Sequence, residues 1–160
     1  EFRGVERRCS LRATLPYRGQ DLLFIEDYGH HPHAVKSTWQ AVQSAYPERR
    51  IVMVFQPHRY SRTMAMKDAF VDVLRSVELL VLLDVYSAGE LHEEFNSDVS
   101  LYQAMREGKS DSTIFVSRRD DLGEALFEVI KPGDVIIFQG AGSIGSMLND
   151  VVDHVKQGVC

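Results

Sequence analysis

Apolar positions fall into two patterns along the chain: short unbroken runs, and longer stretches in which they recur every three or four residues. The clearest run is residues 51–55, five apolar residues rich in β-branched and aromatic types and bounded by polar positions. Such a run predicts a strand that is buried on both faces of a sheet. Residues 22–25, 79–83, 114–116 and 135–138 show the same pattern and are also expected to form strands.

The stretches between these strands carry apolar stripes at helical spacing, which predict helices that pack on a core. The first helix is expected to begin near Pro32, which suits a first helical turn, and to be closed by Pro47. Its stripe is Val35, Trp39, Val42 and Tyr46. Further helices are expected from Thr63 with a stripe reaching Val77, and over residues 101–105, 122–130 and 144–155, whereas residues 91–98 read as an acidic loop.

Residues 8–15 alternate loosely between polar and apolar side chains and are expected to pair antiparallel with residues 22–25. After this hairpin, strands alternate with helices, which implies right-handed crossovers and a mostly parallel sheet. The predicted fold class is therefore α/β, a three-layer, Rossmann-like domain with a mixed, mostly parallel sheet of about six strands and helices on both faces. No linker or repeat interrupts the pattern, so residues 1–160 are expected to form a single domain.

The segments with the most chemistry all follow predicted strands: residues 27–31, 56–62, 84–90 and 139–145. Because the carboxyl ends of parallel strands lie along one edge of a sheet, we expect these four segments to converge on one rim. Open α/β sheets bind their ligands at that rim.

Composition narrows the classes of function. The chain has 160 residues, of which 44% are hydrophobic and 26% charged, an ordinary soluble globular mixture. The net charge of -5 argues against a general nucleic-acid surface, so no nucleic-acid partner is expected. Cys9 and Cys160 lie far apart without metal-type spacing, which suits a reducing compartment. Because no apolar run has membrane-spanning length and no signal peptide opens the chain, we expect no membrane partner and a cytoplasmic location.

A cationic cluster follows the buried run at residues 51–55. His58, Arg59 and Arg62 lie within five positions, just after Pro57, which cannot donate a hydrogen bond to a sheet. Two guanidinium groups at the carboxyl end of a buried strand suit a carboxylate or a phosphate. The plainer alternative is a surface loop whose arginines pair with the abundant acidic residues.

The segment Asp27-Tyr28-Gly29-His30-His31-Pro32 offers a carboxylate, a phenol and two imidazoles at the predicted start of a helix. Asp27 could accept hydrogen bonds from the hydroxyls of a ribose, or it could be a carboxylate that favours the helix start. The histidines at 30, 31, 33 and 58 raise the question of a metal. No metal site is expected, because adjacent histidines do not share a helix face and no spacing matches a zinc pattern.

The segment from Gly140 to Gly145 reads GAGSIG, which matches the dinucleotide-binding pattern GxGxxG after a strand and before a helix. That motif also needs a second strand and an acidic residue about twenty positions further on, and the sequence ends at Cys160. We therefore expect a tight turn with close helix packing, and no NAD. Residues 107–110 resemble the end of a P-loop, but its first glycine would fall at Gln103, so the main phosphate cradle is expected elsewhere.

Four segments occur in order along the chain: DYGHHP at residues 27–32, VFQPHRYSRT at 54–63, DVYSAGE at 84–90 and QGAGSIG at 139–145. Together they resemble the C-terminal domain of the alanine-adding Mur ligases, the UDP-N-acetylmuramate–L-alanine ligases. The resemblance runs from about Gly4 to the last predicted helix. The first segment is shared loosely across Mur ligases, whereas FQPHRYSRT is far more specific.

The resemblance implies a chain cut from a three-domain enzyme, which agrees with a start at Glu1 rather than at Met. An N-terminal domain would hold the UDP-sugar, and a central ATPase domain would hold ATP with Mg²⁺. The implied reaction phosphorylates the carboxylate of UDP-N-acetylmuramate with ATP, and the amine of L-alanine then attacks the acyl phosphate. The C-terminal domain alone is expected to be inactive, because it lacks groups that catalysis needs.

The resemblance also implies roles for individual residues. His58, Arg59 and Arg62 would bind the carboxylate of alanine, in agreement with the anion site expected from residue types alone. Tyr28 and His30 would line the pocket for the methyl group and the amine. The chemistry of imidazole near neutral pH further permits the hypothesis that His30 takes the proton from that amine.

Asp27 would hold the ribose hydroxyls of ATP, and the loop that follows, including His31, would lie beside the adenine. Two other functions remain open on the residues alone. One is a dinucleotide-binding module that uses residues 140–145. The other is a non-catalytic domain that senses a small anion through Arg59 and Arg62.

Overall fold

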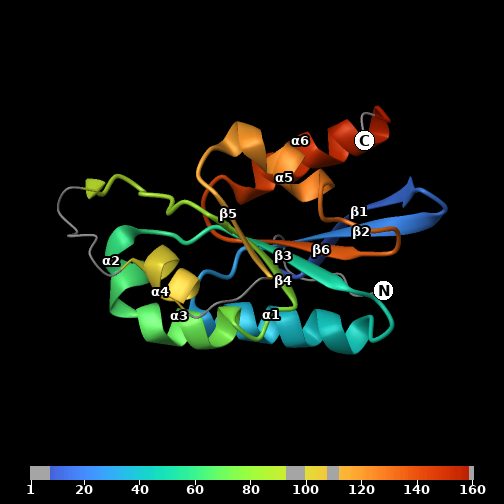
Figure 1. The fold of residues 1–160 in the computed structure, drawn as a ribbon. Helices are drawn as coiled ribbons and strands as arrows, with labels where there is room; N and C mark the ends of the chain where they lie inside the picture. Colours follow the sequence, from blue (N-terminus) through green and yellow to red (C-terminus); the bar gives the residue numbers. More distant parts are fainter. Residues whose placement is uncertain (1–7, 93–99, 108–111, 159–160) are drawn as a thin grey trace.

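The computed structural model describes residues 8–92, 100–107 and 112–158. Within these ranges, six strands form one sheet in the order β1-β2-β6-β3-β4-β5 (Figure 1). The strands are β1 (Ser10–Tyr17), β2 (Gln20–Asp27), β3 (Ile51–Phe55), β4 (Leu79–Leu83), β5 (Thr113–Val116) and β6 (Val135–Gln139). β1 pairs antiparallel with β2, and the other pairs are parallel. The predicted mixed, mostly parallel sheet is confirmed.

Helices cover both faces of this sheet, which gives the predicted three layers. The helices are α1 (Pro32–Ala45), α2 (Tyr60–Ala65), α3 (Lys67–Leu74), α4 (Leu101–Glu107), α5 (Leu122–Phe127, after a 3₁₀ turn at Arg119–Asp121) and α6 (Ile144–Lys156). Figure 1 shows α1, α3 and α4 on one face, and α5 and α6 on the other. None of the helices in the described ranges is long and apolar enough to cross a bilayer.

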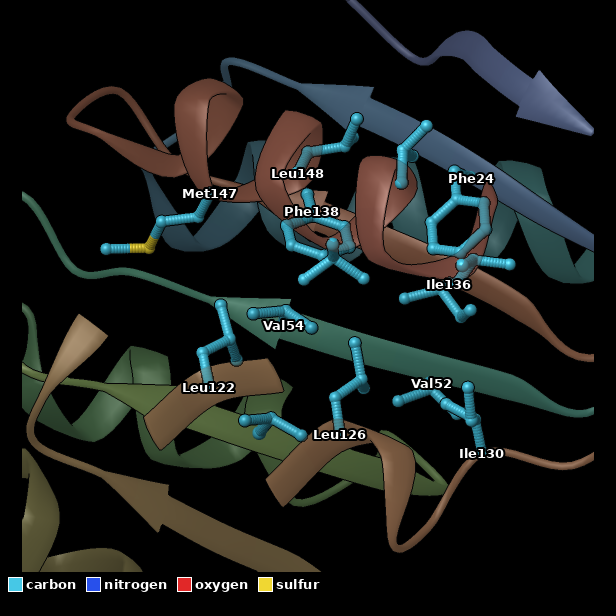
Figure 2. Close-up of a cluster of buried hydrophobic side chains, with 14 of the residues drawn as sticks. Phe24, Val52, Val54, Leu122, Leu126, Ile130, Ile136, Phe138, Met147 and Leu148 are labelled. Atoms are coloured by element: carbon cyan, nitrogen blue, oxygen red, sulfur yellow. The ribbon is translucent and has the colours of Figure 1, made fainter. Parts of the chain in front are cut away.

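An apolar core lies on each side of the sheet. Every residue of β3 and β6 is buried, because both strands lie inside the sheet and are covered from both faces. Figure 2 shows the core under α5 and α6, where Leu122, Leu126 and Leu148 pack with residues of β3 and β6. The opposite core joins α1, α3 and α4 to the sheet through residues that include Val35, Met53, Phe55, Phe70 and Leu74.

Two predicted helices have different bounds in the structure. The helix expected to start at Thr63 begins at Tyr60, and it is interrupted at Met66, whose φ of -114° and ψ of 19° are not helical. The helix expected to reach Ile130 ends at Phe127. Both boundaries were wrong because hydrophobic spacing reports the buried face of a helix and not a local change of the backbone. The acidic segment, and the glycine and lysine of the P-loop-like segment, fall largely at residues 93–99 and 108–111, outside the described residues.

β6 creates the place where a ligand site is expected. It lies between β2 and β3, which are followed by helices on one face, whereas α6 follows β6 on the other face. Chain connections that leave for opposite faces open a crevice at the carboxyl ends of the strands. In the strand register, Gln139 of β6 pairs with Asp27 of β2 on one side and with Phe55 of β3 on the other.

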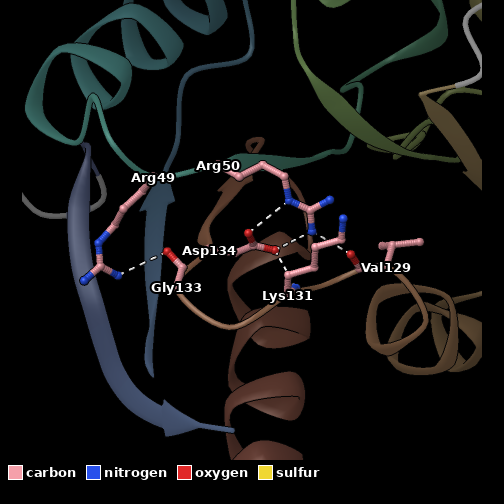
Figure 3. Close-up of polar contacts among 6 residues, drawn as sticks. All are labelled: Arg49, Arg50, Val129, Lys131, Gly133 and Asp134. Carbon is pink, nitrogen blue, oxygen red and sulfur yellow. Dashed lines mark hydrogen bonds and ion pairs between the residues drawn. The ribbon is translucent and has the colours of Figure 1, made fainter. Parts of the chain in front are cut away.

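The opposite end of the sheet is tied together by an ion pair. Figure 3 shows Arg50, just before β3, beside Asp134, just before β6. Nε and Nη2 of Arg50 donate to the carboxylate at 3.0 and 2.6 Å, and the backbone nitrogen of Lys131 donates to it at 2.7 Å. Asp134 is 2% exposed, so these bonds replace the water that its charge has lost. This end is therefore structural.

We expect Asp134→Ala to lower the free energy of unfolding by about 2 kcal/mol, because it removes the carboxylate that accepts from Arg50 and leaves the backbone nitrogen of Lys131 without this acceptor. Urea unfolding of the isolated chain measures the change. Asp153→Ala is the matched control, since Asp153 is exposed and its nearest cation, Lys156, lies 3.9 Å away. The control should change stability by less than about 0.5 kcal/mol. Equal effects of the two substitutions would contradict the assignment.

Candidate functional site

Four aromatic rings form a continuous row across three loops at the carboxyl edge of the sheet. The rings of Tyr28 and His30, after β2, have centroids 5.6 Å apart. His30 lies 5.4 Å from His58, after β3, and His58 stacks on Tyr86, after β4, at 5.5 Å with an interplanar angle of 18°. The glycine turn after β6 joins the same cluster through Gly142, which packs against Tyr86. The predicted convergence of the four segments on one rim is confirmed.

The two histidines present opposite hydrogen-bonding groups. Nδ1 of His30 lies 3.1 Å from the carbonyl oxygen of Tyr28. Because a carbonyl can only accept, this nitrogen carries the proton, and Nε2 of neutral His30 has a free lone pair. Nδ1 of His58 lies 3.2 Å from Nη1 of Arg62, which can only donate, so neutral His58 carries its proton on Nε2. The site therefore offers an acceptor and a donor on neighbouring rings.

Arg62 and Arg59 lie beside this row and are held in different ways. Arg62, one helical turn after His58, donates from Nη1 to the ring of His58 and to its carbonyl oxygen. Arg59 is exposed and has φ of 68° and ψ of 132°, a conformation that is costly for any residue other than glycine. Its backbone nitrogen donates to the carbonyl of Tyr86 at 2.8 Å, and its carbonyl accepts from Thr63. Bonds on both sides hold the strained backbone in place.

Asp27 organises the loop that carries Tyr28 and His30. Its carboxylate accepts hydrogen bonds from the backbone nitrogens of Gly29 at 2.6 Å and Cys9 at 2.7 Å, and from Nε2 of Gln139 at 2.7 Å. Asp27 is 6% exposed. The same Gln139 nitrogen donates to the carbonyl of Gly29 at 2.7 Å. The carboxylate thus joins three separate parts of the chain.

A hollow of about 450 Å³ opens beside Asp27 and is lined by Arg8, Asp27, Tyr28, Gly29, His30, His31, Ala34, Ser37 and Thr38. The predicted nucleotide residues Asp27 and His31 therefore share one concave surface with Tyr28 and His30. Arg59 and Arg62 do not line this hollow. Arg62 is linked to the hollow through His58, to which it donates and whose ring contacts that of His30.

The glycines of the GAGSIG turn make room for protein atoms. A Cβ at Gly142 would lie 2.5 Å from Cγ of Tyr86, and a Cβ at Gly145 would lie 2.5 Å from Oε1 of Glu26. Gly140 has φ of 151°, and a Cβ there would meet backbone atoms of the loop after β3. This agrees with the predicted tight turn and close packing, and it gives the glycines a purpose other than dinucleotide binding.

The surroundings of His58 and Glu90 lower the pKa of both residues. Burial lowers the pKa of His58, and the nearby His30, Arg62 and Arg59 lower it further, although Glu90 opposes them. Hydrogen bonds from Ser61 are the largest cause of the lowered pKa of Glu90, and the charge of Arg59 adds to it. Glu90 accepts from both the backbone nitrogen and the hydroxyl of Ser61. The site therefore holds a neutral His58 and an ionised Glu90 near neutral pH.

The lowered pKa of His58 predicts an acid-side loss of stability. As the pH falls below the ordinary histidine value of 6.5, the unfolded chain takes up a proton at His58 before the folded chain does, so unfolding is favoured. The loss is complete once the pH is below the pKa of folded His58. Unfolding free energies measured between about pH 7.5 and pH 5 should fall less steeply in His58→Gln than in the parent. His33→Gln, at an exposed position of α1, is the control and should leave the slope unchanged.

Sequence reasoning brought together Tyr28, His30, His58 and Arg62, but it gave no role to Tyr86, Glu90, Ser61 or Gln139. Ser61 follows β3, Tyr86 and Glu90 follow β4, and Gln139 is the last residue of β6. Their position in the chain was the available signal, because every loop after a parallel strand reaches the same rim. Within the described residues, no group of three or more His, Cys, Asp or Glu side chains is arranged to hold a metal.

A family model described as "Mur ligase, glutamate ligase domain" matches residues 7–142. The chain belongs to the Mur ligase family. The expected resemblance is thereby confirmed, and the loops after β2, β3 and β4 fall within the matched part of the Mur ligase domain.

Individual relatives place the chain more closely within the family. It is 45% identical over 152 residues to the UDP-N-acetylmuramate–L-alanine ligase of Coxiella burnetii, covering 95% of this chain and 33% of that protein. The chain thus spans about a third of the length of the curated relatives it matches.

Solved Mur ligases share the fold. The UDP-N-acetylmuramate–alanine ligase MurC of Thermotoga maritima matches with a TM-score of 0.73 and 24% identity, over 98% of this chain and 31% of that one. The MurF ligase of Thermotoga maritima, solved in complex with ADP, matches with a TM-score of 0.57 and 16% identity, over 98% and 32%. At these identities the two structures support the fold alone.

Proposed function

We propose that this chain is the C-terminal domain of a cytoplasmic, ADP-forming UDP-N-acetylmuramate–L-alanine ligase of peptidoglycan precursor synthesis. The observation that carries the proposal is the pair of complementary histidines beside two arginines, in a chain 45% identical to such a ligase. The remaining two thirds of the enzyme would supply the UDP-sugar site and the main ATP site. Alone, this domain would therefore turn over nothing.

The site has the groups that a free amino acid needs. The carboxylate of L-alanine would accept hydrogen bonds from Nε2 of His58 and from the guanidinium groups of Arg59 and Arg62. Its amine would donate to the free lone pair of Nε2 on His30. The ring centroids of His30 and His58 are 5.4 Å apart. In this arrangement His30 can take the proton that the amine loses when it attacks the acyl phosphate. The ring of Tyr28, packed edge-on against His30, would bound the space for the methyl group.

The nucleotide would lie on the other side of His30, against the hollow that Asp27 and His31 line. Asp27 accepts three hydrogen bonds from the protein, and a carboxylate has about four lone-pair positions, so one ribose hydroxyl can still donate to it. Mg²⁺ would be held, with the main part of ATP, by the central domain that the family resemblance implies. His31, which lines the same hollow, would lie beside the adenine.

Phosphate release by the full-length enzyme tests the proposal. With ATP and UDP-N-acetylmuramate present, L-alanine should stimulate release strongly, and glycine and L-serine less so. The isolated chain should release no phosphate with any of the three amino acids. Release that ignores L-alanine in the full-length enzyme, or turnover by the isolated chain, would overturn the proposal. Tight binding of L-alanine to the isolated chain would instead favour the anion-sensing alternative.

A further inference from the structure

We propose that Tyr86 and Glu90, in the loop after β4, are positioning residues that set the affinity of the enzyme for its amino-acid substrate. This inference rests on the proposed function and names residues for which the sequence pattern gave no role. Neither side chain needs to touch L-alanine. Instead, both hold the segment from His58 to Arg62, called here the clamp segment or clamp, in the conformation that binding of the substrate carboxylate requires.

The backbone of Tyr86 pairs with the clamp segment as if β3 and β4 continued past their ends. The nitrogen of Tyr86 donates to the carbonyl of Pro57, and its carbonyl accepts from the nitrogen of Arg59, both at 2.8 Å. His58 and Tyr86 form an isolated parallel bridge between these two bonds. The pairing fixes one side of Arg59, whose φ of 68° would otherwise relax to a commoner value.

The ring of Tyr86 is held from two sides. One face of the ring stacks on His58 at 5.5 Å. Gly142, in the turn after β6, lies so close to the ring that a Cβ at this position would clash with it. Tyr86 therefore transmits the position of the β6 turn to the imidazole that would donate to the substrate. Because Tyr86 is 41% exposed, packing between these neighbours, rather than deep burial, determines where its ring lies.

Glu90 fixes the other end of the segment. Its carboxylate accepts from the nitrogen of Ser61 at 3.1 Å and from the hydroxyl of the same residue. Its negative charge also faces Arg59, and the attraction contributes to the lowered pKa of Glu90. One acidic residue thus holds the start of α2 and attracts the charge of Arg59. The loop after β4 contacts the clamp at His58, Arg59 and Ser61.

Kinetics of the full-length enzyme test the role of the ring. Tyr86→Leu should raise KM for L-alanine about tenfold, because a clamp that is misplaced by a fraction of an ångström binds its ligand poorly. KM for ATP should stay within about twofold of the parent, since Tyr86 does not line the hollow that Asp27 and His31 share. Tyr86→Phe retains the ring and should restore KM for L-alanine to the parent value. A merely structural role would lower the active fraction and leave both KM values unchanged.

A pair of glycine variants tests the same contact without touching Tyr86. Gly142→Ala places a Cβ 2.5 Å from Cγ of Tyr86 and should raise KM for L-alanine as Tyr86→Leu does. Gly145→Ala, in the first turn of α6, places a Cβ equally close to Glu26 and should leave that KM unchanged. Glu90→Gln keeps one acceptor for Ser61 but removes the charge that faces Arg59. It should raise KM for L-alanine several-fold, and it provides a second test if Tyr86→Leu fails to fold.

The outcomes separate this inference from the proposed function. If the parent enzyme does not use L-alanine, the proposed function fails. If the parent uses L-alanine but Tyr86→Leu, Gly142→Ala and Glu90→Gln all retain the parent KM for it, the function stands and the positioning role is wrong. A rise in KM for L-alanine that Tyr86→Phe reverses and Gly145→Ala does not reproduce supports the positioning role.

Discussion

Arg59→Gly is expected to make the isolated chain more stable and the full-length ligase almost unable to use L-alanine. Arg59 has φ of 68° and ψ of 132°, which costs a residue with a Cβ about 1 to 3 kcal/mol. Glycine removes that strain, at an entropic cost of about 0.5 to 1 kcal/mol. The exposed side chain of Arg59 contributes little packing, so urea unfolding should show a gain of about 1 kcal/mol.

The same substitution removes a guanidinium from the proposed carboxylate site. Losing a hydrogen-bonded charge pair with the substrate costs about 3 to 4 kcal/mol, so kcat/KM for L-alanine should fall roughly 10²- to 10³-fold. Arg59→Lys is the control. It keeps a positive charge and the backbone strain but loses the planar fork, so its activity should lie between those of the parent and the glycine variant. A glycine variant that is less stable, or as active as the parent, would show that the strain does not serve binding.

Opposite effects on stability and activity at one residue would explain why the strain is present. The segment after β3 must turn sharply after Pro57 and still start α2 at Tyr60. Arg59 donates a hydrogen bond to Tyr86 and accepts from Thr63, and these bonds hold it in that turn from both sides. Strain that neighbouring bonds maintain at a predicted ligand-binding residue is a common property of binding sites.

The sequence was sufficient to predict the parts of this molecule that depend on burial. Residues 51–55 and 135–138 are apolar throughout because β3 and β6 are covered on both faces. The convergence of the loops follows from the parallel sheet, which is why the sequence alone predicts that Tyr28, His30 and His58 share one rim. Such features follow from pattern and connectivity, which a single sequence contains.

Features that depend on contacts between distant loops were not predictable in this way. The stack of Tyr86 on His58 depends on the register of β3 and β4 past their ends, which no local pattern encodes. The break at Met66 leaves the apolar stripe intact, so the stripe could not reveal it. GAGSIG matched a ligand motif because glycine is required wherever backbone approaches other atoms, and here those atoms belong to Tyr86 and Glu26.

Asp27→Asn is expected to lower the free energy of unfolding by about 3 kcal/mol, even with no nucleotide present. Both carboxylate oxygens of Asp27 accept hydrogen bonds, from Cys9 on one oxygen and from Gly29 and Gln139 on the other. Asparagine offers one acceptor, and its NH₂ group would point at an N–H donor whichever way the amide is turned. Asp27→Ala should therefore be about as unstable as Asp27→Asn. Asp21→Asn, at an exposed position of β2, is the control and should change stability by less than about 0.5 kcal/mol.

Because Asp27 holds the loop of Tyr28 and His30, loss of ATP use in Asp27→Asn cannot by itself identify a ribose contact. Deoxy analogues of ATP separate the two roles in the full-length enzyme. If a ribose hydroxyl donates to Asp27, the parent should prefer ATP over 2′-deoxy-ATP or 3′-deoxy-ATP, and Asp27→Asn should lose that preference. If the variant keeps the full preference while its KM for ATP rises, Asp27 acts only by ordering the loop. The ribose role would then have to move to another residue lining the hollow, of which His31 and Thr38 have suitable polar groups.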